Sequence, residues 1–172
     1  MKFFSGFYLK NEQELFEPLL EKTDYTVAGF SYGAQKAIEY ALSAKQRVER
    51  IILLSPAFFK TQSKSFLRAQ THYFSANKDQ YIQNFLSNIC LPNSHINLEK
   101  YLDDGSVEQL EELLTYQWEK DALVLLKNRG TKIEVFLGNE DKIINSKDAF
   151  DFFSKYTTTY LIKKAGHLLD VR

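Results

Sequence analysis

Short apolar runs alternate with amphipathic segments along most of the chain. Five runs bounded by polar or turn residues predict β-strands, at residues 2–4, 25–28, 48–54, 133–137 and 160–162. Between them, apolar residues recur at helical spacing in three segments, 12–22, 32–43 and 148–156. This alternation predicts a parallel sheet with helices on both faces and right-handed crossovers. In such a sheet, chemistry gathers at the carboxyl ends of the strands.

One long stretch between the third and fourth predicted strands interrupts the alternation. It contains no convincing strand, and its periodicity predicts helices at 64–74, 78–88, 107–116 and 122–127. A connection of this length is too long to be a simple loop. We therefore expect a single α/β unit with a core formed by residues 1–56 and 129–172 and a helical lid at 57–128, and a lid implies a substrate to cover.

Charge and composition narrow the classes of protein. The chain has 172 residues, with 22 basic and 22 acidic side chains, so no global field attracts nucleic acid or an anionic membrane. The single cysteine, Cys90, excludes an internal disulfide or a cysteine-based zinc cluster and fits a reducing compartment. The N-terminal apolar segment is too short for a signal peptide, and no run is long enough to span a bilayer. These features predict a soluble cytoplasmic protein.

A serine stands on the turn between the second strand and the helix that follows it. The segment Gly29-Phe30-Ser31-Tyr32-Gly33 has the G-x-S-x-G pattern of a nucleophile on a sharp strand-to-helix turn, where the two glycines prevent collisions with strand and helix. A serine that simply caps the helix gives the same local pattern. The choice between these readings depends on partners for Ser31.

A serine nucleophile needs a base, and the base needs an orienting acid. His167 follows the fifth strand, on the same edge of the sheet as Ser31, whereas His72 and His95 fall in the predicted lid, where surface or structural roles are expected. Asp141 follows the fourth strand and gives the order serine, acid, histidine. An Asx-turn is the alternative role for Asp141, and its neighbour Glu140 is the rival acid.

Ester hydrolysis also needs hydrogen-bond donors for the developing oxyanion. The backbone N–H of Tyr32, directly after the nucleophile, is the first candidate. The backbone N–H of Phe7 is the second, because it follows the first strand and Gly6 permits a bend there, although Gly6 is equally consistent with an ordinary turn. No metal or organic cofactor is required for this chemistry.

Five segments resemble motifs of the α/β-hydrolases, and more narrowly of the pimeloyl-acyl-carrier-protein methyl ester esterases of biotin synthesis. Phe4-Ser5-Gly6-Phe7 is similar to the oxyanion loop, and the segment around Ser31 to the nucleophile elbow. The others resemble the entry to the lid, the acid loop and the histidine loop: Ser55-Pro56-Ala57-Phe58-Phe59, Gly138-Asn139-Glu140-Asp141 and Lys164-Ala165-Gly166-His167. The resemblance implies a minimal α/β-hydrolase fold with a mainly parallel sheet of about five strands.

The chain departs from that family in length. It lacks strands before the oxyanion loop, a strand between that loop and the elbow, and the final helix, as in the short form of these esterases. It also has Ser5 where the family has histidine, which weakens the assignment of the oxyanion loop. The missing strands predict apolar surface that a partner subunit would cover; the number of subunits is not predicted.

The resemblance implies a reaction and a partner. The expected reaction is hydrolysis of the methyl ester of a pimeloyl chain attached to an acyl carrier protein, with Ser31, Asp141 and His167 catalytic. Carrier proteins are acidic, and Lys60, Lys64 and Arg68 would share one helix face as a docking site, unless they form an ordinary solvated face. Hydrolysis of another small acyl ester or thioester, and a non-catalytic hydrolase-like binding protein, are the alternatives.

Overall fold

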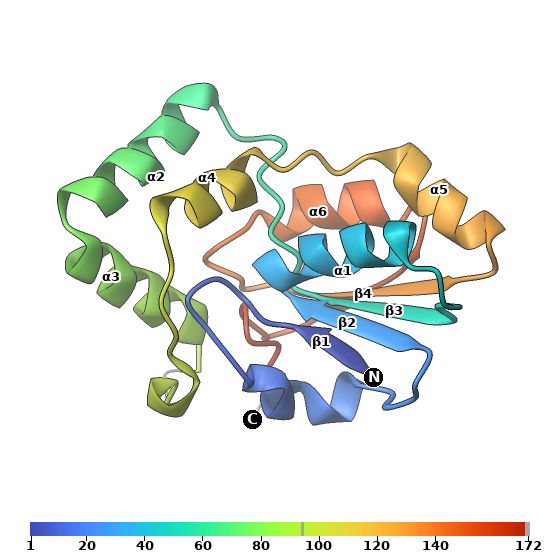
Figure 1. The fold of residues 1–172 in the computed structure, drawn as a ribbon. Helices are drawn as coiled ribbons and strands as arrows, with labels where there is room; N and C mark the ends of the chain where they lie inside the picture. Colours follow the sequence, from blue (N-terminus) through green and yellow to red (C-terminus); the bar gives the residue numbers. More distant parts are fainter. Residues whose placement is uncertain (94, 171–172) are drawn as a thin grey trace.

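The protein is built on a five-stranded parallel sheet. A computed structural model describes residues 1–93 and 95–170. The strands lie side by side in chain order, all parallel (Figure 1): β1 Lys2–Phe4, β2 Thr26–Phe30, β3 Arg50–Leu54, β4 Lys132–Gly138 and β5 Thr158–Ile162. This arrangement confirms the predicted parallel α/β sheet of five strands.

Three helices cover one face of the sheet. They are α1 Tyr32–Ser43, α5 Lys120–Asn128 and α6 Ser146–Phe153, which lie together above the strands in Figure 1. Alternate strand residues point toward them and are fully buried, among them Ile51, Leu53, Val135 and Leu137. Each such side chain contributes about 1.5–3 kcal/mol through burial, so this layer forms the main core.

A short helix covers part of the opposite face. The segment η1, Glu12–Leu19, packs Phe16 against Phe30, with ring centroids 4.7 Å apart, and this core also contains Leu168 and Leu169. The strands lie in chain order, so every crossover connection moves across the sheet in the same direction. A connection that passes over this face therefore has the opposite handedness to the connections through α1, α5 and α6, which pass over the other face. The expectation of uniformly right-handed crossovers is therefore wrong for the connection from β1 to β2.

The segment η1 also corrects the predicted α-helix at 12–22. It is a 3₁₀-helix that ends at Leu19 and contains Pro18. Proline has no backbone N–H, so it cannot donate the hydrogen bond to the carbonyl of residue 14 that an α-helix requires there. The periodicity identified the buried Phe16 but not the helix type.

The long insertion is helical, as its periodicity predicts. It contains α2 Lys64–Ala76, α3 Lys78–Cys90, the 3₁₀ turn η2 Glu99–Tyr101, and α4 Val107–Thr115. The helices α2, α3 and α4 stand beside the carboxyl ends of the strands (Figure 1), and side-chain oxygens of Ser63, Asn77 and Ser106 cap their N-termini. Within the predicted lid range 57–128, α5 instead packs against α1 and β4.

The outer end of the sheet carries exposed apolar side chains. Tyr160 on β5 stacks on Phe136 of β4, with ring centroids 4.9 Å apart, and remains 43% exposed. Its neighbour Leu161, on the same edge strand, is also 43% exposed. Apolar surface is thus present at this edge, and its coverage by a partner stays a prediction.

Candidate active site

Ser31 occupies a strained turn between β2 and α1. Its φ of 52° and ψ of −112° lie far from helical values, and its side chain bonds none of the helix N–H groups in the way a capping serine does. A Cβ at Gly29 would lie 2.2 Å from the carbonyl oxygen of Gly33, and one at Gly33 would lie 2.0 Å from that of Phe4. Glycine is therefore required on both sides of Ser31, and the capping reading fails.

Ser31 and Asp141 both hydrogen-bond to His167. The Nε2 of His167 lies 3.0 Å from the Oγ of Ser31, and its Nδ1 lies 2.6 Å from the Oδ2 of Asp141. The side chains of His167 and Asp141 are fully buried, and Ser31 is 2% exposed. Within water-poor surroundings, this chain of contacts orients the imidazole so that Nε2 can accept the serine proton.

The loop after β4 orients Asp141 independently of the histidine. Its Oδ1 accepts hydrogen bonds from the backbone N–H groups of Ile143 at 2.7 Å and Ile144 at 3.2 Å. Asp141 therefore makes an Asx-type turn with one oxygen and binds His167 with the other, so both roles considered for it hold together. Glu140, the rival acid, is exposed.

A buried serine at the end of β3 helps to place the histidine loop. The Oγ of Ser55 donates to the backbone carbonyl of His167 at 2.7 Å, and Ser55 has a φ of 40°. The ring of Phe30 lies against the imidazole, with centroids 5.1 Å apart. Ser55 was not singled out as a site residue from the sequence; its position directly after a strand end was the available signal.

The other two histidines lie outside this cluster, as expected. His72 is an exposed residue of α2. His95 lies between α3 and η2, with Nε2 3.2 Å from the carboxylate of Asp170, and its side chain is 58% exposed. Both have surface positions in the insertion, so His167 is the histidine that can serve Ser31.

The two backbone groups assigned to an oxyanion hole lie on elements that border Ser31. Tyr32 is the first residue of α1, where helix N–H groups are free of intrahelical partners. Phe7 is 2% exposed and lines the same cavity as Ser31. In the loop between β1 and η1, the N–H of Gly6 donates to the buried carboxyl group of Glu12 at 2.7 Å, a contact that the sequence did not reveal. The assignment of Phe7 and Tyr32 as donors stays a prediction.

A cavity of about 490 Å³ lies between Ser31 and the helices of the insertion. Its walls are largely aromatic and aliphatic, with Phe7 from the core, Phe66 from α2 and Leu113 from α4 among them. Five carboxamides from α2, α3 and the residue between them belong to the polar part of the wall: Gln70, Asn77, Gln80, Asn84 and Asn88. Lys142 is the charged residue among the described lining residues, so the cavity suits an apolar chain with uncharged polar groups.

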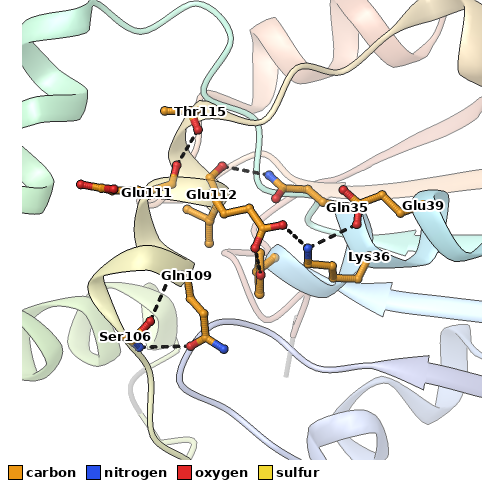
Figure 2. Close-up of polar contacts among 10 residues, drawn as sticks. Gln35, Lys36, Glu39, Ser106, Gln109, Glu111, Glu112 and Thr115 are labelled. Carbon is orange, nitrogen blue, oxygen red and sulfur yellow. Dashed lines mark hydrogen bonds and ion pairs between the residues drawn. The ribbon is translucent and has the colours of Figure 1, made fainter.

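The helix α4 is fastened to α1 next to the nucleophile. Figure 2 shows Lys36 bonding to both Glu112 and Glu39, and the side chain of Gln35 donating to the backbone of α4, at the carbonyl of Leu113, at 3.0 Å. Glu112 also accepts a hydrogen bond of 2.5 Å from the phenol of Tyr32. Burial and this hydrogen bond raise the pKa of Tyr32 to about 12, so its phenol stays protonated at neutral pH.

The three basic residues proposed for docking do not share a helix face. Lys64 and Arg68 are exposed on α2 at positions i and i+4, as expected. Lys60 precedes this helix, and its Nζ donates to the backbone carbonyl of Trp118 at 3.1 Å. The prediction of one continuous face is wrong for Lys60, because the helix begins only after the capping residue Ser63.

Among residues 1–93 and 95–170, no group of three or more histidine, cysteine or acidic side chains is arranged to hold a metal ion. No helix in the same part of the chain is long and apolar enough to cross a membrane.

Comparison with known proteins supports the fold assignment. No protein-family model and no curated protein sequence matches the chain. Among solved structures, it is similar to the esterase EaEST from Exiguobacterium antarcticum, with a TM-score of 0.62, 17% identity and coverage of 91% of this chain and 63% of that one. MenH from S. aureus has a TM-score of 0.62 at 14% identity, with coverage of 98% of this chain and 87% of MenH. Carboxylesterase CesB (YbfK) from Bacillus subtilis has a TM-score of 0.54 at 19% identity, with coverage of 91% and 57%.

These comparisons define the class of fold. At such identities, structural similarity establishes the α/β-hydrolase fold. The chain spans less than two thirds of the length of EaEST and of CesB.

Proposed function

We propose that the protein is a serine esterase in which Ser31 is the nucleophile, His167 the general base and acid, and Asp141 the residue that orients His167. The observation that carries the proposal is the continuous hydrogen-bonded chain from Ser31 through His167 to Asp141 at the wall of an apolar cavity. A capping serine or a structural histidine does not require such an arrangement.

The reaction proceeds in two stages. The Nε2 of His167 takes the proton of Ser31 as its Oγ attacks the ester carbonyl, and the backbone N–H groups of Phe7 and Tyr32 bind the oxyanion. His167 then returns the proton to the departing alcohol, which leaves an acyl-serine. A water molecule, deprotonated by His167, attacks this acyl group and releases a carboxylic acid with the serine restored.

The substrate that we propose is the methyl ester of a pimeloyl chain carried by an acyl carrier protein, with methanol as the departing alcohol. The cavity volume and apolar walls suit an aliphatic acyl chain, and the carboxamides of the wall offer hydrogen-bond partners for polar groups of the substrate. The exposed cations of Lys64 and Arg68 suit an acidic partner. Acyl esters or thioesters of other alcohols and thiols are the alternative substrates.

Hydrolysis of p-nitrophenyl butyrate tests the catalytic assignment. Wild-type protein is expected to hydrolyse it, whereas Ser31→Ala loses at least about 10³-fold in kcat. Ser87→Ala, an exposed serine on α3, is the matched control and should match wild type. Equal rates for wild type and Ser31→Ala, or no turnover by either, would contradict the proposal and favour a non-catalytic binding protein.

A second comparison tests the carrier-linked substrate. Charge reversal at Lys64 and Arg68 together should lower kcat/KM for carrier-linked pimeloyl methyl ester about 10-fold at low salt and leave p-nitrophenyl butyrate unaffected. The double variant Lys120→Glu/Lys127→Glu, with the same charge change on α5, serves as control. Equal loss on both substrates, or no turnover of the carrier-linked ester by an active enzyme, would refute this substrate.

A further inference from the structure

We propose that Glu12 is a positioning residue for the oxyanion loop, which it holds by binding the N–H of Gly6 so that the N–H of Phe7 faces the reacting carbonyl. This inference rests on the esterase function proposed above. It assigns a role to a buried acidic side chain that the triad chemistry leaves unused.

The burial of Glu12 is unusual for a carboxyl group. Its exposure is 0%, and its Oε1 accepts the N–H of Gly6 at 2.7 Å. In the part of the chain that the structure describes, its Oε2 has no hydrogen-bond partner within bonding geometry. Since an acidic side chain is costly to bury with incomplete hydrogen bonding, Glu12 opposes folding more than an apolar side chain of similar size would.

Gly6 is the residue of this loop that most needs an anchor. Without a side chain, its φ and ψ are free to change, and such a change rotates the next peptide and the N–H of Phe7 with it. A Cβ at Gly6 would lie 2.8 Å from the ring of Phe30, so a larger residue does not fit as a substitute anchor. The hydrogen bond from the Gly6 N–H to Glu12 fixes the peptide before Gly6. It thereby limits the rotation of the peptide after Gly6, which carries the N–H of Phe7.

Hydrogen bonds from two residues hold the peptides on either side of Gly6. Glu12 binds the N–H of Gly6, and the carbonyl of Gly6 accepts from the N–H of Leu9 at 3.2 Å. Further along the loop, the carbonyl of Tyr8 accepts from the N–H of Asp103, and the N–H of Lys10 donates to the carbonyl of Tyr101, both in the insertion. Glu12 therefore holds the peptide before Gly6, and the other contacts hold the residues after it.

Glu12 can accept the Gly6 N–H in either protonation state. Burial raises the pKa of its carboxyl, although the backbone N–H groups of Gly6 and Glu12 and the hydroxyl of Ser5 act in the other direction. Both a carboxylate oxygen and the carbonyl oxygen of a neutral carboxyl accept a backbone N–H. Glutamine has the same shape and the same acceptor, so it should replace Glu12.

Steady-state kinetics with three substitutions test the proposal. Glu12→Ala and Glu12→Asp, which remove or shorten the acceptor, should lower kcat for p-nitrophenyl butyrate about 10–100-fold with KM changed less than about threefold. Glu12→Gln should retain at least about one third of kcat. Glu17→Ala, an exposed glutamate in the same 3₁₀-helix, is the control and should equal wild type.

Each outcome separates this inference from the proposed function. If wild type and Ser31→Ala are equally inactive, the esterase proposal fails and the role of Glu12 fails with it. If wild type is active and folded Glu12→Ala has the same kcat, only the role of Glu12 is overturned. If Glu12→Ala does not fold, Glu12→Asp decides. If neither Glu12→Ala nor Glu12→Asp folds, the role of Glu12 is structural and the proposal is overturned. The proposal is also overturned if Glu12→Gln loses as much activity as Glu12→Ala or Glu12→Asp.

Discussion

Replacing Asp141 with asparagine gives the sharpest test of the site, because the two carboxylate oxygens have different partners. One oxygen accepts the N–H groups of Ile143 and Ile144, and the other binds Nδ1 of His167 at 2.6 Å. An asparagine that keeps its oxygen on the backbone N–H groups turns its NH₂ group toward Nδ1. The imidazole must then carry its proton on Nε2, where it cannot accept the proton of Ser31.

If the asparagine side chain flips, its oxygen accepts from Nδ1 of His167 and restores the tautomer with a free Nε2. The structure defines the cost of this flip. The NH₂ group of the asparagine then faces two backbone N–H donors, which lose their acceptor at about 1–3 kcal/mol each. The active orientation is thus disfavoured by about 2–6 kcal/mol in total, which corresponds to a fall in kcat of about 30-fold to about 10⁴-fold. The backbone should keep its fold, because the disfavoured orientation is simply not populated.

The assay compares kcat for p-nitrophenyl butyrate among wild type, Asp141→Asn and Glu140→Gln. The neighbouring Glu140 is exposed, so its substitution controls for a charge lost from the same loop. Circular dichroism and thermal melting establish that each variant is folded. A folded Asp141→Asn with kcat within about threefold of wild type, while Ser31→Ala is inactive, would refute the orientation argument.

Three further predictions concern stability, measured by chemical denaturation. Gly29→Ala places a Cβ 2.2 Å from the carbonyl oxygen of Gly33, so we expect a loss of at least about 3 kcal/mol or no soluble protein; a loss below about 1 kcal/mol would contradict this. Trp118→Phe removes the indole donor to the carbonyl of Ala57, 2.9 Å away. Because that carbonyl also accepts from Gln35, the lost bond should cost about 0.5–1.5 kcal/mol, and an unchanged midpoint would show that it is dispensable. Hydrogen bonds from Lys36 and Tyr32 lower the pKa of Glu112. Glu112 should therefore stabilise the fold by less than about 1 kcal/mol relative to Glu112→Gln above pH 4.5, and this difference should disappear as the pH falls further. A pH-independent difference would contradict this prediction.

The fold could be predicted from the sequence because its strands are short apolar runs and the three central ones are largely buried. All five appear as apolar runs bounded by polar or turn residues, and β2 has no exposed position along its length. The hand of the connection from β1 could not, because it depends on which face of the sheet the other helices leave uncovered, a property of the whole fold. For the helix type of η1, the available signal was Pro18.

The candidate site could be predicted in part, for a related reason. Ser31, Asp141 and His167 each follow a strand, and parallel strands bring their carboxyl ends to one edge. Ser55 and Glu12 were not predicted to contact the site, because each binds a backbone group of another segment. For Ser55 the available signal was its position directly after a strand, whereas Glu12 had none.

Close backbone packing explains how so small a sheet can hold the site. A Cβ at Gly138 would lie 2.2 Å from the carbonyl oxygen of Gly166, so the loops that carry Asp141 and His167 touch through their main chains. A Cβ at Gly166 would in turn lie 1.7 Å from the carbonyl oxygen of Leu91, at the end of α3. These contacts involve β4, β5 and the insertion, and none of them needs a strand beyond the five present. Because the histidine loop packs directly against the insertion, we expect a displacement of α3 at this end to shift His167 relative to Ser31.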